Sequence, residues 1–149
     1  YPYYRNIGKR LVKRPKIYFG DTGLASYLMG INSVENLITS PSFGSLFETM
    51  VVTDFLKRYL HHGQMPSMYY LRTQDDLEVD LIIENEEKLN LVEIKSSSTI
   101  KKEHVPSLLR AALTLKERVE RSIVISNTSE QFLVAKGIQN IPVKSILPI

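Results

Sequence analysis

The hydrophobic residues between positions 45 and 60 recur at the spacing of an α-helix. Phe47, Val51 and Phe55 lie four positions apart, so they share one helix face, and neighbouring apolar residues widen this stripe. Gly63, a residue type that interrupts helices, follows this apolar pattern. The pattern therefore predicts a helix from about residue 45 to residue 60.

A shorter helix is predicted nearer the N-terminus. The run Asp21-Thr22-Gly23 is typical of a helix N-terminal cap, and Gly30 is typical of the position after a helix end. We therefore expect a short helix from Leu24 to Met29. Residues 17–19 are Ile, Tyr and Phe, a composition that favours a strand.

After Pro66 the period of the pattern falls to two, which is typical of strands. Three strands are predicted in succession, at residues 68–71, 79–84 and 89–95. The polar residues 85–88 indicate a hairpin turn between the last two. We therefore expect a three-strand meander.

The last third of the chain predicts a helix and two further strands. Residues 106–118 have helical apolar spacing, residues 122–126 resemble a buried strand, and residues 141–143 fit a short final strand. A helical crossover usually returns the chain parallel to the strand that it left. The predicted fold is thus a single α/β domain over residues 1–149, whose central mixed sheet holds the meander and a fourth, parallel strand, flanked by helices.

Three charged residues lie on the predicted strands. Asp80 stands in a strand where Val79, Leu81 and Ile83 take alternate positions. Glu93 and Lys95 are two positions apart, so their side chains share one strand face. The hairpin lays Asp80 beside Glu93, and two carboxylates and an ammonium then meet at one end of the sheet.

Glu48 is the fourth charged candidate, on the packed side of the helix predicted over residues 45–60. Buried charge is costly unless it is paired or bound to a metal. Mg²⁺ or Mn²⁺ prefers oxygen ligands, so Asp80 and Glu93 are predicted to hold such an ion, with Glu48 completing the shell. Lys95 would orient the attacking water or stabilise developing negative charge.

The same residues also fit a structural interpretation. Glu93 and Lys95 are equally a same-face ion pair on a half-exposed strand, and Asp80 is equally a turn cap. Arg72 and Glu78 flank the proposed site; they either support it or form a surface ion pair.

The chain is mildly basic, with a net charge of +3, and its basic residues gather at the N-terminus. Such a run suits a nucleic acid backbone, although a solvated basic arm has the same composition. The candidate phosphate-binding residues are Lys9, Arg10, Lys13, Arg14 and Lys16.

Several classes of protein are excluded by what the sequence lacks. There is no cysteine for a disulfide or thiolate site, which is compatible with a cytoplasmic protein. No apolar run approaches the roughly 20 residues of a membrane-spanning helix. No glycine-rich phosphate loop ending in Gly-Lys-Ser/Thr occurs, so we expect no ATP site in this chain.

Five segments together resemble a known family. They are residues 13–25, 44–48, 69–73, 78–80 and 93–95. They are similar to an uncharacterised domain that forms the C-terminal part of predicted prokaryotic AAA+ ATPases, and the similarity runs across nearly the whole chain.

This resemblance implies a restriction-endonuclease-like fold of the PD-(D/E)xK type. In that pattern Glu48 is the acid of the first helix, Asp80 the strand acid, and Glu93 and Lys95 the E-x-K pair. Val79 stands where the strict pattern has proline. The resemblance also implies an ATPase module and a winged-helix segment before Tyr1, with residues 1–16 as the junction.

Three functions are consistent with these observations. The first is a metal-dependent nuclease that acts on DNA and is tethered to the ATPase. The second is a catalytically inactive module of the same fold that binds nucleic acid or a protein for the ATPase. The third is a structural or regulatory domain that mediates oligomerisation.

Overall fold

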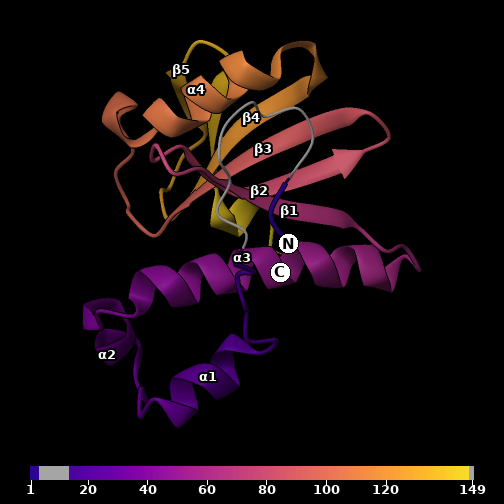
Figure 1. Ribbon diagram of the computed structural model, residues 1–149. Helices are drawn as coiled ribbons and strands as arrows, with labels where there is room; N and C mark the ends of the chain where they lie inside the picture. The colour runs from indigo at the N-terminus through magenta and orange to yellow at the C-terminus, as the bar shows by residue number, and fades with distance from the viewer. Residues whose placement is uncertain (4–13, 148–149) are drawn as a thin grey trace.

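The computed structural model describes residues 1–3 and 14–147, and it places a six-stranded sheet between helices (Figure 1). The long helix α3 (Phe43–His61) covers one face of the sheet and α4 (Pro106–Leu115) covers the other. The short helices α1 (Thr22–Leu28) and α2 (Val34–Thr39) contact α3 on its side away from the sheet (Figure 1). None of the helices in the described ranges is long and apolar enough to cross a membrane.

Three helices begin and end close to the predicted positions, namely α1 (Thr22–Leu28), α3 (Phe43–His61) and α4 (Pro106–Leu115). The fourth α-helix of the described residues is α2 (Val34–Thr39). The Asp21 side chain accepts a hydrogen bond from the Leu24 amide, which confirms the predicted cap of α1. The prediction placed the end of α4 three residues too late, because Lys116 adopts a positive φ of 48° and residues 116–118 form a 3-10 turn.

The sheet has the spatial order β1-β2-β3-β4-β6-β5. Its strands are β1 (Ser67–Arg72), β2 (Glu78–Asn85), β3 (Lys88–Lys95), β4 (Val119–Ser126), β5 (Phe132–Ala135) and β6 (Ile138–Pro142). The first three form an antiparallel meander, and β4 lies parallel to β3 after the α4 crossover. The predicted mixed sheet is thus confirmed, and β6 and β5 extend it.

Toward the two ends of the chain, two predictions were wrong or incomplete and two elements were missed. Residues 17–19 are not a strand, because they have no neighbouring strand, and Ile17 is 91% exposed. Helix α2 was not predicted, since it buries no residue. The last strand begins earlier than predicted, at Ile138, and the edge strand β5 was missed because its Leu133 side chain is exposed, although apolar.

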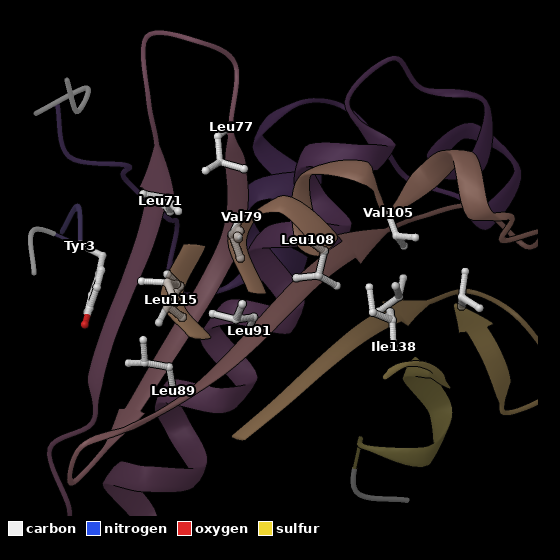
Figure 2. Close-up of a cluster of buried hydrophobic side chains, with 14 of the residues drawn as sticks. Tyr3, Leu71, Leu77, Val79, Leu89, Leu91, Val105, Leu108, Leu115 and Ile138 are labelled. Carbon is white, nitrogen blue, oxygen red and sulfur yellow. The ribbon is translucent and has the colours of Figure 1, made fainter. Parts of the chain in front are cut away.

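Two hydrophobic cores hold the layers together. Figure 2 shows the core between the sheet and α4, where Leu91 of β3 and Leu108 of α4 are fully buried. The second core lies under α3, where Phe47 and Val51 pack on the other face of the sheet. The predicted helical stripe therefore faces the sheet, and its burial supplies the driving force for docking α3.

A bulge interrupts β2 at Asp80. Tyr69 of β1 pairs with Ile82 and Leu71 pairs with Val79. Two residues of β2 therefore lie between these pairs, opposite a single residue of β1. The predicted alternation was therefore wrong at this point, because Val79 joins the core under α4 whereas Leu81 joins the core under α3. A bulge re-aims the side chain that it carries, and here that side chain is a carboxylate.

Candidate functional site

The candidate site lies where β2 begins and β3 ends, beside the first half of α3. The Lys16 ammonium joins two of the predicted residues, since Nζ lies 3.0 Å from Glu48 Oε1 and 3.7 Å from Asp80 Oδ1. On β3, Lys95 Nζ lies 2.6 Å from Glu93 Oε1. Asp80 lies close enough to both Glu93 and Lys95 to interact with their charges. The four side chains predicted from the sequence are therefore neighbours in the fold.

Asp80 is held by the backbone of the neighbouring strand. Regular pairing between β2 and β3 extends as far as Leu81 opposite Val92. Beyond that point the Ile94 amide donates to Asp80 Oδ2 at 2.8 Å instead. The carboxylate thus satisfies the amide that the bulged strand leaves free, and its other oxygen, Oδ1, faces the site.

Glu93 is the most deeply buried acid of the site, with 7% of the residue exposed. Its Oε1 pairs with Lys95, but its Oε2 is buried without a hydrogen-bond partner among the described residues. A buried polar atom without a partner is uncommon and costs free energy. This oxygen is therefore available to a ligand.

Burial makes both strand carboxylates harder to ionise, and a neighbouring acid adds to the effect on each, Asp80 for Glu93 and Glu48 for Asp80. Burial and the neighbouring charge of Asp80 raise the pKa of Glu93 to about 7, although Lys95 opposes the shift. Burial also raises the pKa of Asp80, against the opposing effect of the Ile94 amide. Such a pair favours a proton or a cation at the site.

Lys16 and Tyr18 complete the site, although the sequence pattern does not predict that either of them lies there. The Tyr18 hydroxyl donates to Glu48 Oε1 at 2.8 Å. Burial and this hydrogen bond raise the pKa of Tyr18. The two residues are two positions apart on an extended segment, with the exposed Ile17 between them. That alternation was the available signal, and it was interpreted as a strand.

Glu78 also lies within this cluster, as a residue predicted to support the site. Its Oε1 lies 3.2 Å from Lys16 Nζ, and its Oε2 lies 3.8 Å from Arg72 Nε. The carboxylates of Glu48, Asp80 and Glu78 outweigh the effect of burial, which lowers the pKa of Lys16, and the net pKa is raised. Lys16 therefore stays charged.

The predicted basic run is only partly described. Lys9, Arg10 and Lys13 lie outside the described residues. The Arg14 carbonyl accepts a hydrogen bond from the Tyr70 hydroxyl, and Lys16 faces the carboxylates. Within residues 1–3 and 14–147, no three histidine or acidic side chains have the arrangement of a metal site; the Lys16 ammonium lies between three of the carboxylates.

Glu93 is expected to make the metal-free chain less stable as the pH rises. Its pKa is about 7 in the fold against an ordinary value of 4.5, so the folded chain binds more protons than the unfolded chain between these values. The free energy of unfolding therefore falls from about pH 5 to pH 8. We expect Glu93→Gln, which cannot ionise, to remove about 2 kcal/mol of this fall.

Urea unfolding of both proteins at pH 5 and pH 8 measures this difference. Glu103→Gln is the matched control, because Glu103 is an exposed acid in a surface pair with Lys101. Equal pH dependence of the wild type and Glu93→Gln would contradict the raised pKa of Glu93.

Two family models match this chain. One, described as a domain of unknown function (DUF4143), matches residues 43–146 and so includes Glu48, Asp80, Glu93 and Lys95. The other, described as a domain of unknown function (DUF8612), matches residues 1–35, which include Lys16 and Tyr18. The residues of the candidate site are therefore divided between the two matched regions.

Two curated proteins are similar to the chain along almost its whole length. They are the uncharacterized proteins Rv2008c of Mycobacterium tuberculosis and Mb2031c of Mycobacterium bovis, each 32% identical over 98% of the chain. The chain spans 31% of the length of each. No solved structure matches it.

Proposed function

The chain belongs to the DUF4143 family of domains of unknown function, and from the geometry of its site we propose that it is a metal-dependent nuclease-like domain that acts on DNA phosphodiesters. The observation that carries this proposal is the pair Asp80 and Glu93. These two carboxylates come from adjacent strands, each has a raised pKa, and Lys95 lies beside them. Raised pKa values of this kind gather at functional sites.

The oxygen atoms of the site fit Mg²⁺ or Mn²⁺. Glu93 Oε2 is buried without a partner among the described residues, and the ion pair of Asp80 Oδ1 with Lys16 is long, at 3.7 Å. Hard divalent cations take oxygen ligands and usually bind through one or two carboxylates. Asp80 and Glu93 would hold the ion, with Glu48 completing the shell. When bound, such an ion activates a water and offsets negative charge on the scissile phosphate.

The protein itself would supply a positive charge and a fixed geometry. Burial lowers the pKa of Lys95, but Glu93 and Asp80 more than compensate, so its pKa is raised and it stays protonated. An ammonium at this place stabilises the negative charge that develops on the phosphate oxygens. The Ile94 amide keeps the Asp80 carboxylate in position through its hydrogen bond.

The wider context of the proposal comes from the family resemblance. The acid on α3, the three-strand meander and the parallel β4 after the α4 crossover are consistent with a restriction-endonuclease-like fold. The resemblance to domains of predicted AAA+ ATPases supports a role as the C-terminal part of such a protein. In this proposal an ATPase module of the same polypeptide is the partner of the domain.

The test is DNA cleavage by the purified chain. Supercoiled plasmid and single-stranded DNA are incubated with the chain and either Mg²⁺ or Mn²⁺, and then with EDTA. Asp80→Asn, purified in parallel, controls for contaminating nucleases. We expect cleavage that needs the metal and is absent from the variant. Equal cleavage by both preparations, or intact DNA in every reaction, would contradict the proposal.

A catalytically inactive protein-binding module is the second candidate. It is favoured by apolar side chains that α1, α2 and the link between them leave exposed; they include Tyr27, Leu28, Met29, Val34 and Ile38. Exposed apolar residues gathered in one region are typical of interaction sites. The cleavage assay separates the two candidates, because a binding module leaves both DNA substrates intact with either metal.

A further inference from the structure

Lys16 is the only basic side chain that contacts three carboxylates of the site, within the part of the chain that the structure describes. Its Nζ lies 3.0 Å from Glu48 Oε1, 3.2 Å from Glu78 Oε1 and 3.7 Å from Asp80 Oδ1. The side chain is 22% exposed. The positive charge thus lies inside the cluster and not on the surrounding surface.

The extended segment that carries Lys16 is attached at three points. The Tyr18 hydroxyl bonds to Glu48 Oε1, and the Tyr70 hydroxyl donates to the Arg14 carbonyl. The Lys16 ammonium also lies 5.5 Å from the centre of the Tyr70 ring, a cation–π distance. The segment is therefore fixed to the site by contacts on both sides of Lys16.

An ammonium in this position offsets the negative charge of the carboxylates, as a bound metal ion would. It is a compact charge with three donors and no acceptor, and here oxygen atoms of three acids are its partners. Two of these acids, Glu48 and Asp80, are also members of the proposed metal site. Two cations a few ångströms apart repel each other strongly when they are partly shielded from water. Lys16 and a divalent ion therefore compete for the same oxygen atoms.

We propose that Lys16 is a built-in competitor of the metal, and that a divalent ion binds only when the Lys16 side chain leaves Glu48 and Asp80. This inference rests on the proposed metal site. It makes the segment before α1, which lies outside the residues matched by the DUF4143 family, a control element of that site. Any movement of this segment would change the metal affinity.

The fold leaves room for the lysine to move. A cavity of about 220 Å³ adjoins Lys16 and Asp80, and its wall includes Tyr18, Leu56 and Tyr70. The Lys16 side chain can therefore turn away from the carboxylates while its backbone stays attached through its neighbours. Its charge would remain near the site and would be free to contact an anionic ligand.

The test compares Mn²⁺ affinities at pH 8, where Glu93 is ionised. Isothermal calorimetry is carried out on the wild type, Lys16→Gln and Lys16→Arg. We expect Lys16→Gln to bind Mn²⁺ about tenfold more tightly, because a unit charge close to the ion is removed. Lys16→Arg keeps the charge and is expected to bind no more tightly than the wild type. Lys136→Gln, in the turn between β5 and β6 at the opposite edge of the sheet, controls for the change in net charge.

The outcomes separate this inference from the proposed function. If the wild type binds Mn²⁺ and Lys16→Gln binds equally or less tightly, competition by Lys16 is wrong and the metal site stands. If neither protein binds Mn²⁺, both proposals are wrong. Should circular dichroism show that Lys16→Gln is unfolded, the Lys16→Gln/Glu78→Gln double variant replaces it, since it removes one charge of each sign. Tighter binding by that variant supports the inference, and unchanged binding overturns it.

Discussion

Asp80→Asn is expected to weaken Mn²⁺ binding by about 100-fold. Removing a residue that only hydrogen-bonds to a metal ligand lowers metal affinity by about 10- to 100-fold, and removing the charge of a ligand itself should cost at least as much. Asn has nearly the same shape as Asp, and its amide oxygen can still accept the hydrogen bond from the Ile94 amide. The substitution therefore removes the negative charge while the contact between β2 and β3 remains. The substitution should therefore lower the affinity for the metal and leave the fold intact.

Isothermal calorimetry with Mn²⁺ at pH 8 measures this loss. Asp54→Asn is the matched control, because Asp54 is an acid on α3 that pairs with Arg58. The control should bind Mn²⁺ like the wild type. Saturable binding of equal affinity in Asp80→Asn would show that the ion binds elsewhere, and would remove the main support for a nuclease.

Lys95→Met is expected to lower the rate of DNA cleavage by about 100-fold, the usual cost of removing one group that stabilises transition-state charge. Lys95 also opposes the rise in the pKa of Glu93, so the effect on cleavage has to remain at saturating Mn²⁺. Methionine retains much of the aliphatic part of the side chain. The loss should therefore appear in the cleavage step.

Plasmid cleavage at saturating Mn²⁺, together with calorimetry, separates the two effects. Lys136→Met supplies a matched control at the far edge of the sheet. If Lys95→Met cleaves DNA as fast as the wild type, the predicted role in cleavage is wrong, and Lys95 is only a structural partner of Glu93. A parallel loss of Mn²⁺ affinity and cleavage would place Lys95 in support of the metal site.

The elements that the sequence predicted well are those that local pattern alone determines. The four-residue spacing of Phe47, Val51 and Phe55 predicted α3, and the change of period at Pro66 predicted the meander. The hydrophobic face of a helix and the alternation of a strand both depend on burial against a sheet or core. Neighbours in sequence carry this information, so no distant contact had to be known.

The candidate site was predictable only where it follows such local patterns. Glu93 and Lys95 share a strand face, and a hairpin joins their strand to that of Asp80. Lys16 and Tyr18 reach the site through long-range contacts, and Glu48 is 32 positions from Lys16 in the sequence. Nothing in the spacing of residues 14–20 indicates which acid they meet. The bulge was likewise hidden, because Val79 and Leu81 fit an ordinary alternating strand.

That bulge implies that β2 carries one residue more than the sheet requires. Without Asp80, Val79 would directly precede Leu81, and the two side chains would still point into the two cores that they occupy now. A chain shortened by this single residue would thus have the more regular strand, with Val79 opposite Glu93. The bulge thus marks Asp80 as the residue whose presence the regular pairing of the sheet does not explain.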